Sequence, residues 1–170
     1  MNKLFRLSTG IRLLLCSGLC VASIAAYSAT ATTTFTVSLE IVDSCTISAT
    51  NMDFGSHSDI TAVPPTTSTI TVKCNPGTAY TVGLDAGNVG GSTLAARLMN
   101  NGVDNITFNL FTEAAHTNIW GDSATTPTWV SGTGNGGNQT LTVYGDVPTS
   151  ATPLSSGTYT TTITATITYN

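Results

Sequence analysis

Thr158-Tyr-Thr-Thr-Thr-Ile-Thr-Ala-Thr-Ile-Thr-Tyr169, at the end of the chain, alternates between two kinds of side chain. The odd-numbered positions are mostly apolar, namely Tyr159, Thr161, Ile163, Ala165, Ile167 and Tyr169. The even-numbered positions are all threonine. Because successive side chains of a β-strand point to opposite faces of its sheet, this period of two predicts one long strand. We expect its odd face to be buried and its threonine face to meet solvent.

Shorter stretches of the same kind occur upstream of this strand. They predict strands over residues 70–74, 80–84, 106–111 and 141–147. No stretch repeats apolar residues at helical spacing for more than about a turn. The glycine-rich residues 132–138 lack the lysine and the following helix of a phosphate-binding loop, so we interpret them as a connecting loop. Short strands separated by turn residues predict an all-β, antiparallel sandwich.

One further alternating segment, residues 34–41, lies near the other end of the chain. Its apolar face is Phe35, Val37, Leu39 and Ile41, and threonine, serine and glutamate occupy the positions between them. One interpretation is an ordinary first strand of the chain's own sheet. The other is a strand that adds to the sheet of a second molecule. The pattern alone favours neither.

The first residues have the three-part layout of a secretory signal peptide. Lys3, Arg6 and Arg12 precede an apolar run over residues 13–26, and the Ala29-Thr-Ala31 triplet fits the small-x-small cleavage rule. The apolar run is shorter than the ~20 residues that a membrane-spanning helix needs. We therefore predict an exported protein cleaved after Ala31 (or after Ser28), with residues 1–31 removed.

Cleavage would leave two cysteines, Cys45 and Cys74. An exported chain with two cysteines has one possible connectivity, so we predict a Cys45–Cys74 disulfide. Two isolated thiols lack the four-ligand spacing of a zinc site.

Charge and the scarcity of chemical motifs limit the possible functions. Only 8% of the residues are charged. Beyond residue 31 the chain has two basic residues, Lys73 and Arg97, and all nine of its acidic residues, so this part is strongly negative. Such a chain would repel nucleic acid. His57 and His116, the only histidines, belong to no recognisable metal or catalytic cluster. We therefore predict no enzyme activity, metal or cofactor.

Two tryptophans, Trp120 and Trp129, have two possible roles. They could stack on sugars, but packing within the core or a loop is the favoured interpretation.

Residues 32–170 resemble the spore coat protein U domain family, which includes the Csu-type pilins of the archaic chaperone–usher pathway. The likeness lies in the order and spacing of several short segments. These are Ser44-Cys-Thr-Ile47, Met52-Asp-Phe-Gly55, Ile70-Thr-Val-Lys-Cys74, Tyr80-Thr-Val-Gly-Leu84, Arg97-Leu-Met99, Phe108-Asn-Leu-Phe-Thr112, Ile119-Trp-Gly-Asp122, Thr142-Val-Tyr-Gly145, Gly157-Thr-Tyr159 and Ile167-Thr-Tyr169. The chain has His57 where typical members have tyrosine.

The resemblance implies an immunoglobulin-like sandwich that lacks its last strand and is completed by another molecule. A periplasmic chaperone would fill the resulting groove first, and the N-terminal segment of the next subunit would replace it at the outer-membrane usher. In this chain the donor residues would be Phe35, Val37, Leu39 and Ile41. The contacts of the groove with the chaperone would come from Tyr159, Ile163, Ile167, Tyr169 and the terminal Asn170.

These observations predict a signal peptide (residues 1–31), a donor segment (32–43) and a pilin domain (44–170). The favoured function is a structural pilus subunit, exported to the periplasm and then the cell surface, that supports adhesion and biofilm growth. The alternatives are a secreted spore or cell coat protein of the same fold, or a small adhesive binding module.

Overall fold

The computed structural model describes residues 27–125 and 127–170. This part of the chain forms strands and irregular segments, without a helix that could cross a membrane. The strands are β1 (Cys45–Ala49), β2 (Thr66–Cys74), β3 (Ala79–Leu84), β4 (Arg97–Asn100), β5 (Asn105–Phe111), β6 (Val130–Thr133), β7 (Gln139–Asp146) and β8 (Ala165–Tyr169). The predicted signal peptide falls mainly on residues 1–26, outside this description.

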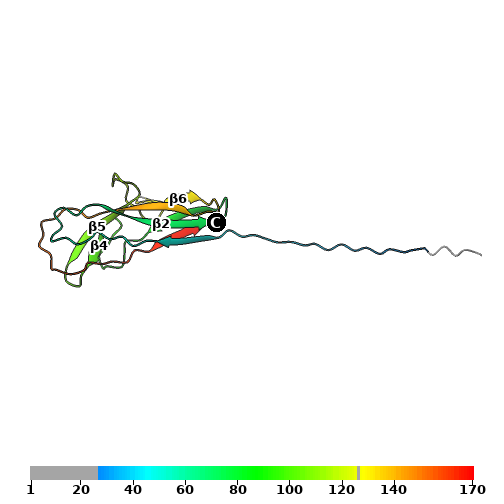
Figure 1. Ribbon diagram of the computed structural model, residues 1–170, viewed down its shortest axis with the longest axis horizontal. Coiled ribbons are helices and arrows are strands. Elements are labelled where there is room, and N and C mark those ends of the chain that lie inside the picture. Colours follow the sequence, from blue (N-terminus) through cyan, green and yellow to red (C-terminus); the bar gives the residue numbers. More distant parts are fainter. Residues whose placement is uncertain (1–26, 126) are drawn as a thin grey trace, which may run out of the picture. The chain divides into compact units, whose positions relative to one another are not determined.

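The chain divides into two units, residues 1–39 and residues 40–170. In the first unit, the described residues 27–39 form no strand and are exposed. The second unit holds all the strands named above, in two sheets (Figure 1). One sheet has the order β1-β2-β7-β5-β4 and the other the order β6-β3-β8, and every pair is antiparallel. The prediction of an all-β antiparallel sandwich is confirmed.

Alternate residues of the central strands form the core. Val72 in β2 and Val82 in β3 are completely buried, and Leu110 in β5 and Val143 in β7 are 4% exposed. In β2 the residues between the buried ones are partly or fully exposed, as the period of two requires. The strands predicted over residues 70–74, 80–84, 106–111 and 141–147 correspond to β2, β3, β5 and β7.

The C-terminal strand is shorter than the sequence pattern predicts. The alternation of half-buried and exposed residues runs through residues 159–168, but β8 spans only Ala165–Tyr169. Before it, side chains replace a neighbouring strand: Asn88 Oδ1 accepts from Thr162 N at 2.9 Å and Asp85 Oδ1 accepts from Thr164 N at 2.9 Å. The strand pattern therefore continues upstream of β8 without a continuous ladder of backbone hydrogen bonds.

Arg97, one of the two cations beyond residue 31, is completely buried and joins the two sheets. From β4 its guanidinium donates to the Leu84 carbonyl at the end of β3 (3.0 Å) and to the Asp85 carbonyl just beyond it (2.8 Å). It also donates to the Trp120 carbonyl (2.6 Å) and to Asn109 Oδ1 in β5 (3.0 Å). Burial lowers the Arg97 pKa to about 10, so the side chain remains charged at neutral pH.

Trp120 belongs to the core. Its side chain is 1% exposed, and the indole Nε1 donates to the Val82 carbonyl at 2.8 Å. The core interpretation is therefore correct for Trp120, and a sugar could not reach its ring. Trp129 is half-buried beside Thr81 and Asp122, near the outer face of β3.

Candidate assembly site

The two sheets each end in an edge strand on the same side of the sandwich. Within the sheets β1 pairs only with β2, and β8 pairs only with β3. Nevertheless β1 and β8 contact each other, and they lie side by side in Figure 1 as the teal and red arrows. An unpaired strand edge presents backbone N–H and C=O groups that can pair with another chain.

The inward side chains of these two edge strands are incompletely covered. We call the set the open seam, and it consists of Cys45 and Ile47 in β1 and Ala165 and Ile167 in β8. Each packs against the core but is only half-buried, whereas the central Val72 is completely buried. An apolar side chain gains free energy in proportion to the area removed from water. A further strand laid over the open seam would therefore stabilise it.

Four large apolar side chains in the predicted donor segment are strongly exposed. Phe35, Val37, Leu39 and Ile41 have exposed fractions of 85%, 83%, 89% and 81%. Soluble proteins rarely expose a contiguous apolar set of this kind unless it binds a partner. Their assignment as donor residues stays a prediction.

The predicted contact residues at the C-terminus differ in burial. Tyr159, Ile163 and Ile167 are half-buried and pack against the core, Tyr169 is 40% exposed, and Asn170 is exposed. The first four are odd-numbered and follow one face of the chain into β8, and Asn170 follows the strand. Their role in binding a chaperone or a subunit stays a prediction.

Tyr159 contacts the turn between β4 and β5. Its hydroxyl donates to the Ser155 carbonyl at 2.8 Å and lies 3.5 Å from a carboxylate oxygen of Asp104. Burial and the Asp104 charge raise the Tyr159 pKa, so the phenol stays protonated at neutral pH. The Ser155 backbone N–H donates to the same carboxylate at 2.7 Å and lowers the Asp104 pKa.

The Met52–Gly55 motif forms the turn that follows β1. Gly55 has a φ of +84°, and its N–H donates to Asp53 Oδ1 at 2.8 Å, which forms a tight turn. Phe54 packs edge-to-face on Phe108 with ring centroids 6.4 Å apart. A side chain at Gly145 would displace the end of the Met52 side chain, which packs closely over this glycine.

The two histidines lie in loops. His57 Nε2 is 2.7 Å from the Phe54 carbonyl oxygen, and the His116 ring lies 5.1 Å from the Phe111 ring, centroid to centroid. Within the described residues, no three His, Cys, Asp or Glu side chains come together as a possible metal site.

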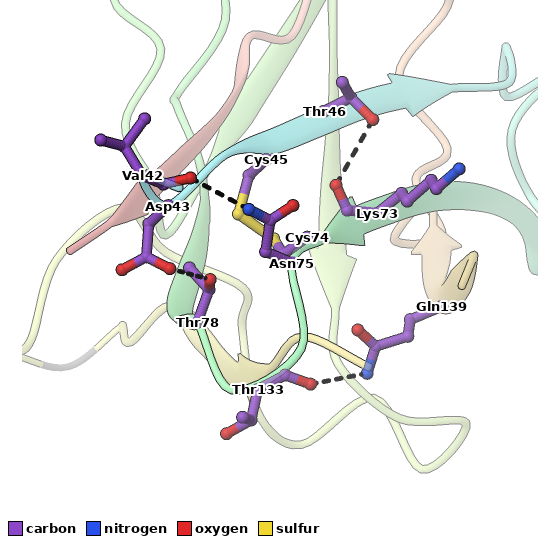
Figure 2. Close-up of a disulfide and its surroundings, with 10 residues drawn as sticks. All are labelled: Val42, Asp43, Cys45, Thr46, Lys73, Cys74, Asn75, Thr78, Thr133 and Gln139. Carbon is purple, nitrogen blue, oxygen red and sulfur yellow. Dashed lines mark hydrogen bonds between the residues drawn. A yellow bond between two sulfur atoms is a disulfide. The ribbon is translucent and has the colours of Figure 1, made fainter. Parts of the chain in front are cut away.

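The predicted disulfide is confirmed. Cys45 and Cys74 are paired residues of β1 and β2, and their sulfur atoms are bonded (Figure 2). The bond therefore ties the first residue of an edge strand to a strand of the core. Both cysteines belong to segments on which the family resemblance depends.

Comparisons with known proteins agree with this architecture. A solved chain in the complex of the CsuC chaperone with the CsuE tip adhesion subunit, from the archaic chaperone–usher Csu pili of Acinetobacter baumannii, shares the fold with a TM-score of 0.57 and 20% identity. The match covers 75% of this chain and 40% of the solved chain. No curated protein matches significantly in sequence. The Spore Coat Protein U domain matches residues 31–166, and the chain therefore belongs to that family.

Proposed function

We propose that this protein is a structural subunit of a chaperone–usher pilus that polymerises by donor-strand exchange. The exposed face of Phe35, Val37, Leu39 and Ile41 would cover the open seam of a neighbouring subunit. The observation that carries the proposal is that one chain holds both parts, an exposed segment with an alternating apolar face and an incompletely covered pair of edge strands.

The free energy expected from burying the donor side chains supports such an exchange. Burying the four donor side chains would contribute on the order of 6–12 kcal/mol in total, at about 1.5–3 kcal/mol each. Backbone hydrogen bonds to the free edges of β1 or β8 would add to this. A head-to-tail contact of this kind does not close on itself, so it extends into a fibre.

The subunit would pass through the periplasm before it reaches the cell surface. Removal of residues 1–31 would release residues 32–43 as the donor segment, ahead of the pilin domain at 44–170. A periplasmic chaperone would cover the open seam until an outer-membrane usher brings the next donor segment. The shared fold with a chain from a chaperone–subunit complex supports the chaperone as a partner. The assembled fibre would serve surface adhesion and biofilm formation.

The test places a charge on either face of the donor segment. Leu39→Asp puts a carboxylate on the apolar face, and Ser38→Asp puts the same charge on the opposite face, one residue away. Because burying an unpaired carboxylate is strongly unfavourable, we expect Leu39→Asp to reduce polymer at least tenfold, equivalent to about 1.4 kcal/mol or more. Ser38→Asp should stay within about twofold of the natural chain.

The measurement is the ladder of polymers on an SDS gel run without boiling, after co-expression with a Csu-type chaperone and usher. Boiling should collapse the ladder to monomer. Equal ladders from the two variants would contradict donor-strand exchange. A ladder that forms equally well without the usher would instead indicate a coat protein that assembles independently.

A further inference from the structure

We propose that residues 42–45 form an anchor that ends the donor segment at Ile41 and removes slack between consecutive subunits, with Asn75 and Thr78 as its positioning residues. This inference rests on the proposed function. It concerns how firmly two subunits are joined rather than whether they join.

Val42, Asp43 and Ser44 are hydrogen-bonded to the turn between β2 and β3, and Cys45 is disulfide-bonded to the last residue of β2. Figure 2 shows the contacts of Val42, Asp43 and Cys45. Asn75 Nδ2 donates to the Val42 carbonyl at 3.0 Å, and the Thr78 hydroxyl donates to the Asp43 carboxylate. The Asn75 N–H donates to the Ser44 carbonyl at 3.0 Å. The disulfide holds Cys45 directly after these three contacts. The path of the backbone is therefore fixed from Val42 into β1.

The turn that receives the anchor is itself held in place. The Thr78 N–H donates to the Asn75 carbonyl at 3.2 Å, which closes the turn, and Thr78 is 2% exposed. Gly77 N donates to the Gly134 carbonyl at 2.9 Å, and Gly134 N donates to the Thr78 carbonyl at 2.8 Å. A side chain at Gly134 would collide with the Asn75 carbonyl, so the two loops pack backbone against backbone. The anchor is bonded to a rigid part of the sandwich.

Val42, Asp43 and Ser44 do not pack in the hydrophobic core, so their contacts add no core burial. All three residues are exposed, with Val42 at 68%, and none belongs to the core cluster. The contacts from Asn75 and Thr78 instead hold residues 42–44, which lie directly before the first strand of the sandwich. Because the Val42 carbonyl is already bonded, we infer that strand addition to a neighbour stops at Ile41.

Loss of the anchor would introduce slack between subunits. Freeing residues 42–44 would turn three residues into a flexible linker, about 10 Å of chain at roughly 3.3 Å for each extended residue, so neighbouring domains could change their orientation more freely. A fibre with such joints bends more easily, while each donor segment still fills its groove.

The test is the double variant Asn75→Ala/Thr78→Val, which removes both side-chain contacts and keeps the disulfide. The matched control is Thr46→Val, which removes an exposed side-chain hydroxyl 3.5 Å from the Lys73 carbonyl on the same pair of strands. Electron microscopy would measure the persistence length of the fibres. We expect the double variant to shorten it at least twofold at unchanged polymer yield, and the control to leave it unchanged. Equal persistence lengths in all three proteins would overturn the inference.

A second measurement does not depend on fibres. In the exported subunit, the backbone amide order parameters of Asp43 and Ser44 should resemble those of β1, about 0.85. In the double variant the value for Asp43 should fall below about 0.6, whereas Ser44 is still held by the Asn75 N–H and the neighbouring disulfide. Low values in the natural chain would overturn the anchor even if fibres form. If the natural chain formed no fibres, the proposed function would fail, and high order parameters would still support the anchor as a structural element.

Discussion

Replacing Arg97 with leucine is expected to prevent stable folding. The guanidinium is the group through which β4 reaches the carbonyls at the end of β3 and the Trp120 carbonyl. Leucine would leave these buried acceptors and Asn109 Oδ1 without their partner. Each buried polar group left without a partner costs about 1–3 kcal/mol, so losing several of them removes a large part of the 5–15 kcal/mol that stabilises an ordinary domain.

The matched control is Lys73→Leu. Lys73 is the other cation of residues 32–170, but its side chain is exposed on β2. We expect its replacement to change the free energy of unfolding by no more than about 0.5 kcal/mol. Urea unfolding of the purified subunit, together with its soluble yield in the periplasm, would measure both variants. Similar unfolding midpoints for the two would show that the Arg97 contacts contribute little.

Removal of the disulfide has the second large expected effect. The Cys45→Ala/Cys74→Ala variant opens a loop with a sequence separation of 29 residues. Chain-entropy reasoning gives such a closure roughly 3–4 kcal/mol of stabilisation. The loss should be concentrated at β1, because this edge strand has β2 as its one partner within the sheet. We therefore expect β1 to detach before the rest of the sandwich unfolds.

Detachment of β1 would also remove half of the open seam. We expect the double alanine variant to show much weaker chaperone binding and much less polymer than the natural chain. This difference should persist at temperatures where the rest of the sandwich is folded. As a control that needs no substitution, urea unfolding would compare the natural chain with its disulfide intact and after reduction. A midpoint shift equivalent to less than about 1 kcal/mol would contradict a major stabilising role for the disulfide.

Strands with a strong alternating pattern were predictable, and the weakest ones were not. Residues 70–74 and 80–84 lie in β2 and β3, because a strand covered on one face must alternate. The four-residue strands β4 and β6 were missed as strands. Val130-Ser-Gly-Thr133 in β6 shows no clear period of two, and it is a strand because β3 supplies its partners. The complete burial of Arg97 at the start of β4 was not predictable, because charged residues are rarely buried completely.

The candidate assembly site was predictable in its parts but not in its arrangement. The apolar alternation of residues 34–41 is visible in the sequence. That β1 and β8 end different sheets on the same side could not be read from it, because sheet order depends on long-range pairing. The anchor was also not predictable from the sequence. Asn75 and Thr78 are common turn residues, and only the fold places Val42 and Asp43 beside them.

Four features were readable from the sequence alone: the strand-rich class, which face of each strongly alternating strand is buried, the cysteine pairing, and the apolar face of residues 34–41. Each of these depends on neighbouring residues or on a choice with one possible answer. Three further features became visible in the folded chain. Arg97 joins the two sheets, the Asp85 and Asn88 side chains accept from backbone N–H groups upstream of β8, and the inward side chains of β1 and β8 remain half-buried. The physical reason is that burial and hydrogen-bond partners come from segments distant in the chain, which local periodicity does not encode.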